Sequence, residues 1–259
     1  MPARRVAGGT SILSSMTATG AAIVSTSELH RRFGEGEAAV HALRGVSIDF
    51  PAGQFTAIMG PSGSGKSTLM HLLAGLDRPT SGSVVVDGQE LAGLDDRRLT
   101  ALRRDKLGFI FQAFNLVPVL TAEENITLPA MLAGRKPDAE WLKTLIDTVG
   151  LRDRLTHRPS ELSGGQQQRV AVARALISRP AVVFADEPTG NLDSASSAEV
   201  LRLLRRAVDE FGQTVIMVTH DAGAAAAADR VVVLRDGEVV HDGASETAED
   251  LLDLMKQVA

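Results

Sequence analysis

The stretch Gly60-Pro61-Ser62-Gly63-Ser64-Gly65-Lys66-Ser67-Thr68 decides the fold. It follows a short apolar run, 55–59, and it precedes residues of helical character that start at Lys66. Two glycines separated by four residues and followed by Lys and Ser complete the P-loop pattern. Glycines let successive backbone N–H groups face phosphate oxygens, and the N-terminal end of the next helix attracts anions. The sequence therefore predicts a strand–loop–helix unit that binds phosphate, which is an α/β architecture.

The side chains of this loop have separate expected roles. Lys66 would reach the β- and γ-phosphates of a nucleotide, and the Ser67 hydroxyl would bind Mg²⁺. A glycine-rich turn that merely connects strand to helix is the alternative, and the complete pattern in this context argues against it. The motif alone does not separate ATPases from kinases and GTPases. The residues expected to bind the nucleotide are Gly60, Pro61, Ser62, Gly63, Ser64, Gly65, Lys66, Ser67 and Thr68.

Strand and helix patterns alternate on both sides of the P-loop. Residues 46–50 alternate like a strand, and 84–88 resemble a strand that enters a hairpin turn. Helices are predicted over 121–132 and 139–149, between two stretches of strand–helix alternation. We therefore expect an N-terminal antiparallel β subdomain and a helical subdomain inserted at about 114–164.

Composition excludes several classes of protein and site. The 259 residues are 44% apolar, which allows a sizeable core, and the net charge of −5 with mixed signs gives no footprint for nucleic acid. No cysteine is present, so disulfides, thiolate metal sites and cysteine nucleophiles are excluded. No run of apolar residues reaches the length of a membrane span. Residues 1–26, rich in Gly, Ala, Ser and Thr, are expected to be a disordered extension of a domain that covers 27–259.

Two adjacent acids follow a second apolar run, 182–185. A buried strand would deliver Asp186 and Glu187 to its carboxyl end, where ligands bind in an open α/β sheet. Neighbouring strand residues point to opposite faces, so we expect different roles. Asp186 would hold Mg²⁺, and Glu187 would act as general base toward water, an effect typically worth about 10²–10⁴-fold in rate. An exposed acidic turn is the alternative, and the P-loop favours the catalytic interpretation.

A further candidate phosphate site consists of Leu162, Ser163, Gly164, Gly165 and Gln166, which precede a helical stretch. Ser163 would cap that helix, and the glycines would let a phosphate approach its N-terminal amides. A single nucleotide does not require two such sites in one chain. By spacing alone, an ordinary capped helix start remains open.

The motif 162–166 resembles the signature motif of ABC (ATP-binding cassette) ATPases, and other motifs follow in that family's order. Gln112 resembles the Q-loop glutamine, Asn191-Leu192-Asp193 the D-loop, and His220 the switch histidine. The similarity covers nearly everything from 27 to 242. It implies a P-loop NTPase with a RecA-like core, which binds ATP and Mg²⁺ and hydrolyses ATP.

In this family two subunits pack head to tail, and each ATP lies between one P-loop and the partner's signature motif. The resemblance therefore implies that residues 162–166 and Asp193 contact the partner's nucleotide in trans. The simplest assembly of this kind is a homodimer. It implies that Gln112 joins Mg²⁺ and the attacking water, and that His220 contacts the γ-phosphate. Asp193 would couple the two sites. A core histidine and a helix-capping aspartate are the structural alternatives.

Phe33 departs from the family pattern. The family commonly stacks adenine on a tyrosine upstream of the P-loop, and this chain has no tyrosine. Phe33 occupies the corresponding position and offers the same π-face, with stacking worth roughly 1–3 kcal/mol. Ordinary core packing of Phe33 is the alternative. Stacking discriminates weakly between bases, so acceptance of GTP stays open.

Within the family, the stretches 57–65, 74–82 and 108–116 most resemble the MacB/LolD type. That resemblance implies a peripheral position on the cytoplasmic face of the membrane and an integral permease as partner, for export of peptides or antimicrobials or for lipoprotein release. The segment 114–118 is expected to expose apolar residues where a permease helix docks, and packing of these side chains in the core is the alternative. An FtsE-like regulator of cell-wall enzymes would have nearly the same residues and stays open. ABC ATPases that act on DNA carry a long coiled coil, which is absent between Lys66 and Asp186.

Overall fold

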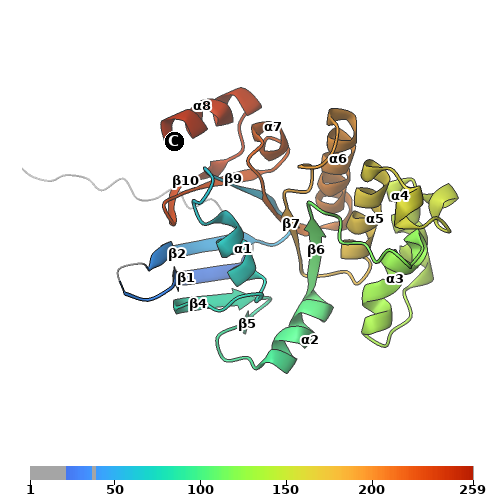
Figure 1. Cartoon of the computed structure of the whole chain (residues 1–259), viewed down its shortest axis with the longest axis horizontal. Helices are drawn as coiled ribbons and strands as arrows, with labels where there is room; N and C mark the ends of the chain where they lie inside the picture. The colour runs from blue at the N-terminus through green and yellow to red at the C-terminus, as the bar shows by residue number, and fades with distance from the viewer. Residues whose placement is uncertain (1–21, 37–38, 259) are drawn as a thin grey trace, which may run out of the picture.

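The computed structural model describes residues 22–36 and 39–258 (Figure 1). The strands are β1 (Ala22–Phe33), β2 (Val40–Pro51), β3 (Phe55–Met59), β4 (Ser81–Val86), β5 (Gln89–Glu90), β6 (Leu107–Phe111), β7 (Val182–Asp186), β8 (Thr214–Val218), β9 (Arg230–Arg235) and β10 (Glu238–Ala244). The helices are α1 (Lys66–Leu73), α2 (Asp96–Lys106), α3 (Ala122–Leu132), α4 (Ala139–Val149), α5 (Gly164–Leu176), α6 (Ser194–Phe211), α7 (Ala222–Ala225) and α8 (Ala248–Val258), with short 3-10 turns at Arg152–Arg154 and Pro159–Glu161.

A six-stranded sheet forms the centre of the chain, in the order β10-β9-β3-β8-β7-β6. All its pairings are parallel except the β9–β10 hairpin. Every residue of β3 and β8 is buried, as expected for central strands covered by helices on both faces. The predicted RecA-like α/β core is therefore confirmed.

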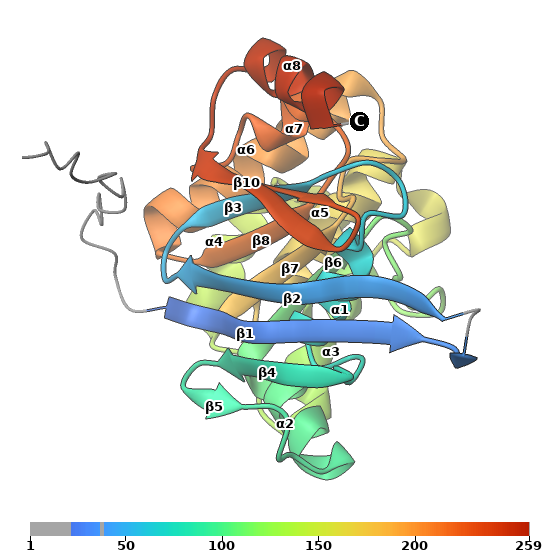
Figure 2. The same cartoon turned by 90° about the vertical axis from the view of Figure 1, so that its left-hand side faces the viewer.

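The first strands form a second, antiparallel sheet in the order β2-β1-β4-β5. Figure 2 shows β2, β1 and β4 lying side by side. Their apolar residues, such as Val24 and Phe50, share one buried cluster with Leu69 and Leu72 of α1. The predicted N-terminal β subdomain is confirmed, and it packs on the helix that follows the P-loop.

Along the chain, helices α3 and α4 follow β6 and precede α5, as the predicted helical insertion requires. Figure 1 shows them gathered with α5 on one side of the sheet. Thr121 and Glu124 form a reciprocal capping box at the start of α3, and Gly150 ends α4 in the left-handed conformation. The Trp141 indole N–H of α4 donates to the Leu176 carbonyl of α5 at 3.1 Å. The insertion therefore packs on α5, which contains the end of the motif 162–166 and is called the signature helix below.

Two segments, the start of β1 and helix α2, differ from the sequence-based expectations. Residues 22–26, assigned above to a disordered extension, belong to β1, where Val24 pairs with both Phe50 and Val86. The rest of that predicted extension, 1–21, lies outside the described residues. Helix α2 is also unpredicted, because charged residues dominate it and only Leu99 and Leu102 are buried. In both segments tertiary packing outweighs a weak local pattern.

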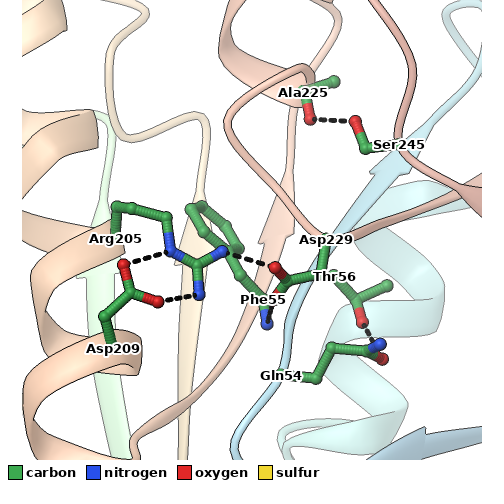
Figure 3. A network of polar contacts seen from close by, with 8 residues as sticks. All are labelled: Gln54, Phe55, Thr56, Arg205, Asp209, Ala225, Asp229 and Ser245. Carbon is green, nitrogen blue, oxygen red and sulfur yellow. Dashed lines mark hydrogen bonds and ion pairs between the residues drawn. The ribbon is translucent and has the colours of Figure 1, made fainter.

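A polar network ties α6 to the amino-terminal end of β3 (Figure 3). The Arg205 guanidinium donates to Asp209 within α6 and, at 2.8 Å, to Asp229 before β9. Asp229 in turn accepts the backbone N–H of Phe55, the first residue of β3, at 2.8 Å. This network fixes the amino-terminal ends of β3 and β9, opposite the P-loop.

Within 22–36 and 39–258, no helix combines the length and the apolar character that crossing a bilayer requires.

Candidate active site

The predicted site residues gather at the carboxyl ends of four parallel strands. The P-loop follows β3, Asp186 ends β7, and Gln112 comes directly after β6. His220 lies two residues beyond β8. Because parallel strands end at the same edge of a sheet, residues up to 160 positions apart in sequence meet there, as ligand sites of open α/β sheets require. The topology therefore brings together one phosphate loop, two carboxylates, an amide and an imidazole.

The glycines of the P-loop meet different physical demands. A Cβ at Gly60 would lie 2.1 Å from the Leu234 carbonyl oxygen, and one at Gly65 would lie 2.4 Å from the Ala42 carbonyl oxygen. Gly63 has open space around it but a φ of +80°, which favours glycine. Gly60 and Gly65 thus let the loop pack against neighbouring strands, and Gly63 lets the backbone turn.

The side chain of Lys66 folds back onto the P-loop. Its ammonium donates to the carbonyl oxygens of Gly60 and Pro61, both at 2.8 Å. Burial lowers the pKa of Lys66, and the negative charges of Glu187 and Asp186 oppose that shift. The ammonium is therefore held at the phosphate loop and next to both acids.

The two acids have different surroundings, as their alternation on β7 predicts. Burial raises the pKa of Asp186, and the charge of Glu187 adds to the rise, while His71 and Lys66 lower it. Glu187 has a left-handed backbone, with φ at +46°, and its carboxylate oxygen Oε1 lies 2.8 Å from His220 Nδ1. Non-glycine residues held in this conformation cluster at functional sites. The exposed acidic turn considered above does not describe this paired, mostly buried carboxylate.

Helix α5 begins at Gly164, within the signature motif rather than after it. Ser163 accepts the Gln166 backbone N–H, and Gln166 Oε1 accepts the Ser163 N–H, which forms a capping box. A Cβ at Gly165 would lie 2.7 Å from Ser196 Oγ on α6. Close packing of α5 on α6 is thus a structural reason for glycine at position 165. This reason is separate from the expected approach of a phosphate.

The Q-loop and the D-loop contact each other directly. Gln112 Nε2 donates to Asn191 Oδ1 at 3.0 Å, and Asn191 Nδ2 donates to the Gln112 carbonyl oxygen at 3.1 Å. Asp193 caps α6 through the Ser196 N–H at 2.9 Å, and this hydrogen bond lowers the Asp193 pKa. Sequence reasoning assigned a role to Asp193 and none to Asn191. No local signal could have found Asn191, because its partner is 79 residues away.

Phe33 ends β1 and is 43% exposed, so the alternative that it packs in the core is wrong. The Arg31 guanidinium lies 4.3 Å from the centroid of the Phe33 ring, and it is paired with Asp77 at 2.9 Å. An exposed aromatic ring held by a fixed cation fits a base-stacking platform.

A separate groove of about 470 Å³ lies between α2, β6, α3 and α5. Leu76 and Leu132, which line it, are 47% and 70% exposed. Of the segment 114–118, only Asn115 lines this groove, and Leu116 packs against the main core instead. The groove is therefore not the predicted segment 114–118, because its apolar lining comes mainly from α3 and β6.

Among the described residues no group of three or more His, Cys, Asp or Glu could hold a metal ion. The expected Mg²⁺ ligands Ser67, Gln112 and Asp186 offer a hydroxyl, an amide and a carboxylate oxygen. Mg²⁺ prefers such hard oxygen donors and usually takes few from the protein, with the rest from phosphates and water. The donor set fits Mg²⁺ bound together with a nucleotide.

Comparisons with known proteins point to one family. The family model described as ABC transporter matches residues 43–190. MacB, a macrolide export ATP-binding/permease protein of Marinobacter nauticus, is 48% identical over 86% of this chain, and the chain spans 35% of its length. An uncharacterized ABC transporter ATP-binding protein of Thermotoga maritima is 50% identical over 79% of this chain and 88% of its own length.

Solved structures agree with the sequence comparisons. A bacterial ABC transporter cassette solved as a dimer matches with a TM-score of 0.77 and 41% identity, over 86% of this chain and 99% of the cassette. A second structure of that cassette, a dimer in a post-hydrolysis state bound to ADP and phosphate, matches equally well.

Proposed function

This chain is an ATPase that belongs to the ABC transporter family, and we propose that two copies of it close around two ATP molecules to drive a MacB/LolD-like permease. The MacB relatives contain a permease in the same chain, and this chain spans about a third of their length. The permease partner and the cargo therefore belong to the proposal. Export of peptides or antimicrobials, or release of lipoproteins, is the cargo class we infer.

The position of the signature motif carries the proposal. The P-loop follows β3, whereas α5 packs against β6, and β8 and β7 lie between these strands. Three strand spacings amount to about 14 Å. A helix N-terminus with two glycines, so far from the P-loop of its own chain, suits the phosphate of a nucleotide bound to a second copy. The dimeric state of the similar cassette supports this arrangement.

In the proposed site, Lys66, Glu187 and Phe33 act on different parts of the nucleotide and the attacking water. Lys66 would exchange the Gly60 and Pro61 carbonyls for phosphate oxygens, which neutralises charge on the γ-phosphate. Glu187 would take a proton from the attacking water. Because its Oε1 is paired with His220, the free Oε2 is the atom for that step. Phe33 would stack on the base.

The Glu187–His220 pair constrains how the histidine works. An ionised carboxylate only accepts, so the proton of this hydrogen bond lies on His220 Nδ1. The other ring nitrogen, Nε2, would face the γ-phosphate, and it donates there only when the ring is doubly protonated. We infer that one carboxylate both orients the histidine and activates water.

Mg²⁺ would supply charge neutralisation between the β- and γ-phosphates when bound. Ser67, Gln112 and Asp186 would hold it, with Asp186 acting through water or directly. Burial raises the pKa of the Asp186 carboxyl, and a cation bound beside it would favour the ionised form.

The groove lined by Leu76 and Leu132 is our candidate for the permease contact. Its apolar floor and its arginines, Arg103 and Arg104 on α2, suit an amphipathic helix with acidic residues. Through this contact the chain would reside on the cytoplasmic face of the membrane. If the co-purified membrane partner proved to act on cell-wall enzymes without moving cargo, the FtsE-like role would replace transport.

Mixed dimers test the composite sites. We combine Lys66→Ala, which disables a P-loop, with Ser163→Arg, which blocks a signature motif at an exposed position. With the two changes in different subunits, both fall in one composite site and the other stays whole, so hydrolysis persists. With both in one subunit, each composite site carries one defect, and hydrolysis is lost. The reverse result would show that each chain completes its own site.

A further inference from the structure

The amide side chains of Gln112 and Asn191 form a closed pair at the edge of the site. Gln112 Nε2 donates to Asn191 Oδ1 at 3.0 Å, and Asn191 Nδ2 donates to the Gln112 carbonyl oxygen at 3.1 Å. We propose that Asn191 is a positioning residue, which sets the orientation of the Gln112 amide for Mg²⁺ and water and thereby links the D-loop to the Q-loop. The proposal rests on the role inferred above for Gln112.

The hydrogen-bond chemistry fixes the direction of both amides. A backbone carbonyl only accepts, so the Gln112 carbonyl must face the NH₂ group of Asn191. That places Asn191 Oδ1 toward the Gln112 side chain, where it requires a donor, and Nε2 is the only donor that this side chain has. Gln112 Oε1 is therefore the end turned away from Asn191. An oxygen, rather than an NH₂ group, is what a magnesium ion needs.

The backbone beside Asn191 is shaped to hold the pair. A Cβ at Gly190 would lie 2.8 Å from Gln112 Nε2 and 3.0 Å from Gln112 Cδ. Any side chain at Gly190 would displace the Gln112 amide from Asn191. The short turn 187–190, closed by the Gly190 N–H to the Glu187 carbonyl at 3.0 Å, joins this contact to the catalytic carboxylate.

A second side-chain amide, on α5, contacts the backbone next to the same two loops. Gln168 of α5 is fully buried, and its Nε2 donates to the Pro188 carbonyl at 2.6 Å and reaches the Phe111 carbonyl at 3.4 Å. Phe111 precedes Gln112, and Pro188 precedes the D-loop. The signature helix thus fixes the distance between the two loops, which keeps Asn191 within reach of Gln112.

Steady-state hydrolysis by the full chain tests the proposal with an isosteric change. Asn191→Asp keeps the shape and the Oδ1 acceptor but replaces the donor with an oxygen that faces the Gln112 carbonyl. We expect kcat to fall about three- to tenfold, the scale of losing oriented hydrogen bonds, with KM for ATP within about twofold. The half-saturating Mg²⁺ concentration should rise. Gln89→Glu, an equal charge change at an exposed position in β5, controls for charge.

A double-mutant cycle separates positioning from general damage to the D-loop. If Asn191 acts through Gln112, Asn191→Ala should cost activity in the parent and almost none in Gln112→Ala. Multiplicative losses, or parental kinetics of Asn191→Asp, would overturn the inference. Full activity of Gln112→Ala would instead overturn the role assigned to Gln112 under the proposed function, so the two failures are distinguishable.

Discussion

The six-stranded sheet has charged groups at both ends of its parallel strands, called here its amino-terminal and carboxyl-terminal edges. Similar groups serve different purposes at these two edges. At the amino-terminal edge, Arg205 donates to two carboxylates, and Asp229 accepts with both of its oxygens (Figure 3). At the carboxyl-terminal edge, Glu187 uses one oxygen on His220, and within 22–36 and 39–258 Lys66 donates only to backbone carbonyls. A saturated network stabilises the fold, whereas groups with remaining hydrogen-bonding capacity are available to a ligand.

The largest expected effect is at Glu187. Glu187→Gln keeps the shape of the side chain but removes the base, so hydrolysis should fall by about 10²-fold or more while ATP binding persists. Size-exclusion chromatography with ATP should detect an accumulated dimer, because the nucleotide is bound and not consumed. Hydrolysis at the parental rate would show that another group activates water and would remove the main contrast between the two edges.

Phe33 tests whether an exposed ring serves the nucleotide. Phe33→Ala should weaken ATP binding by about tenfold, the effect of losing one stacking contact, with little change in kcat at saturating ATP. Fluorescence titration with an ATP analogue measures the affinity. Phe33→Tyr, which retains the π-face, should bind like the parent, and equal affinity of all three proteins would contradict the stacking role.

Gly165 tests whether a glycine in the signature motif serves packing. Gly165→Ala places its Cβ 2.7 Å from Ser196 Oγ, so the melting temperature should fall. Overpacking of this kind costs about 1–3 kcal/mol. Ser196→Gly removes the clashing hydroxyl but also its hydrogen bond to Asp193, so it is measured alone as the reference. Gly165→Ala should then lower the melting temperature less in the Ser196→Gly background than in the parent, and an equal loss in both backgrounds would refute the packing explanation.

The smallest effect is expected at the amino-terminal edge. Arg205→Met should lower the free energy of unfolding by about 1–2 kcal/mol, because Asp229 loses a charged partner, and kcat per folded molecule should stay unchanged. Arg206→Met is the matched control and should change stability little, since Glu210 is its only ionic partner in the part of the chain that the structure describes. A loss of kcat in Arg205→Met would show that the two edges are not independent.

Local pattern was sufficient for much of the fold. Strands β3 and β7 are apolar runs that end at functional motifs, and α4 has a capping aspartate and a terminal glycine. Helix α2 was beyond sequence reasoning because charged residues dominate it. The start of β1 continues a stretch rich in Ala, Ser and Thr, and its order comes from pairing with β2 and β4. The candidate site residues were predicted by motif, and their contacts with one another were not.

The sequence by itself determined which chemical groups the site contains, because the P-loop and the paired acids have fixed spacing along the chain. Only the tertiary structure decided how those groups are used. It paired Glu187 with His220, assigned Gly165 to helix packing, and joined Gln112 to Asn191. The physical reason is that these contacts join residues 31 to 79 positions apart, which meet only after the parallel strands align their carboxyl ends.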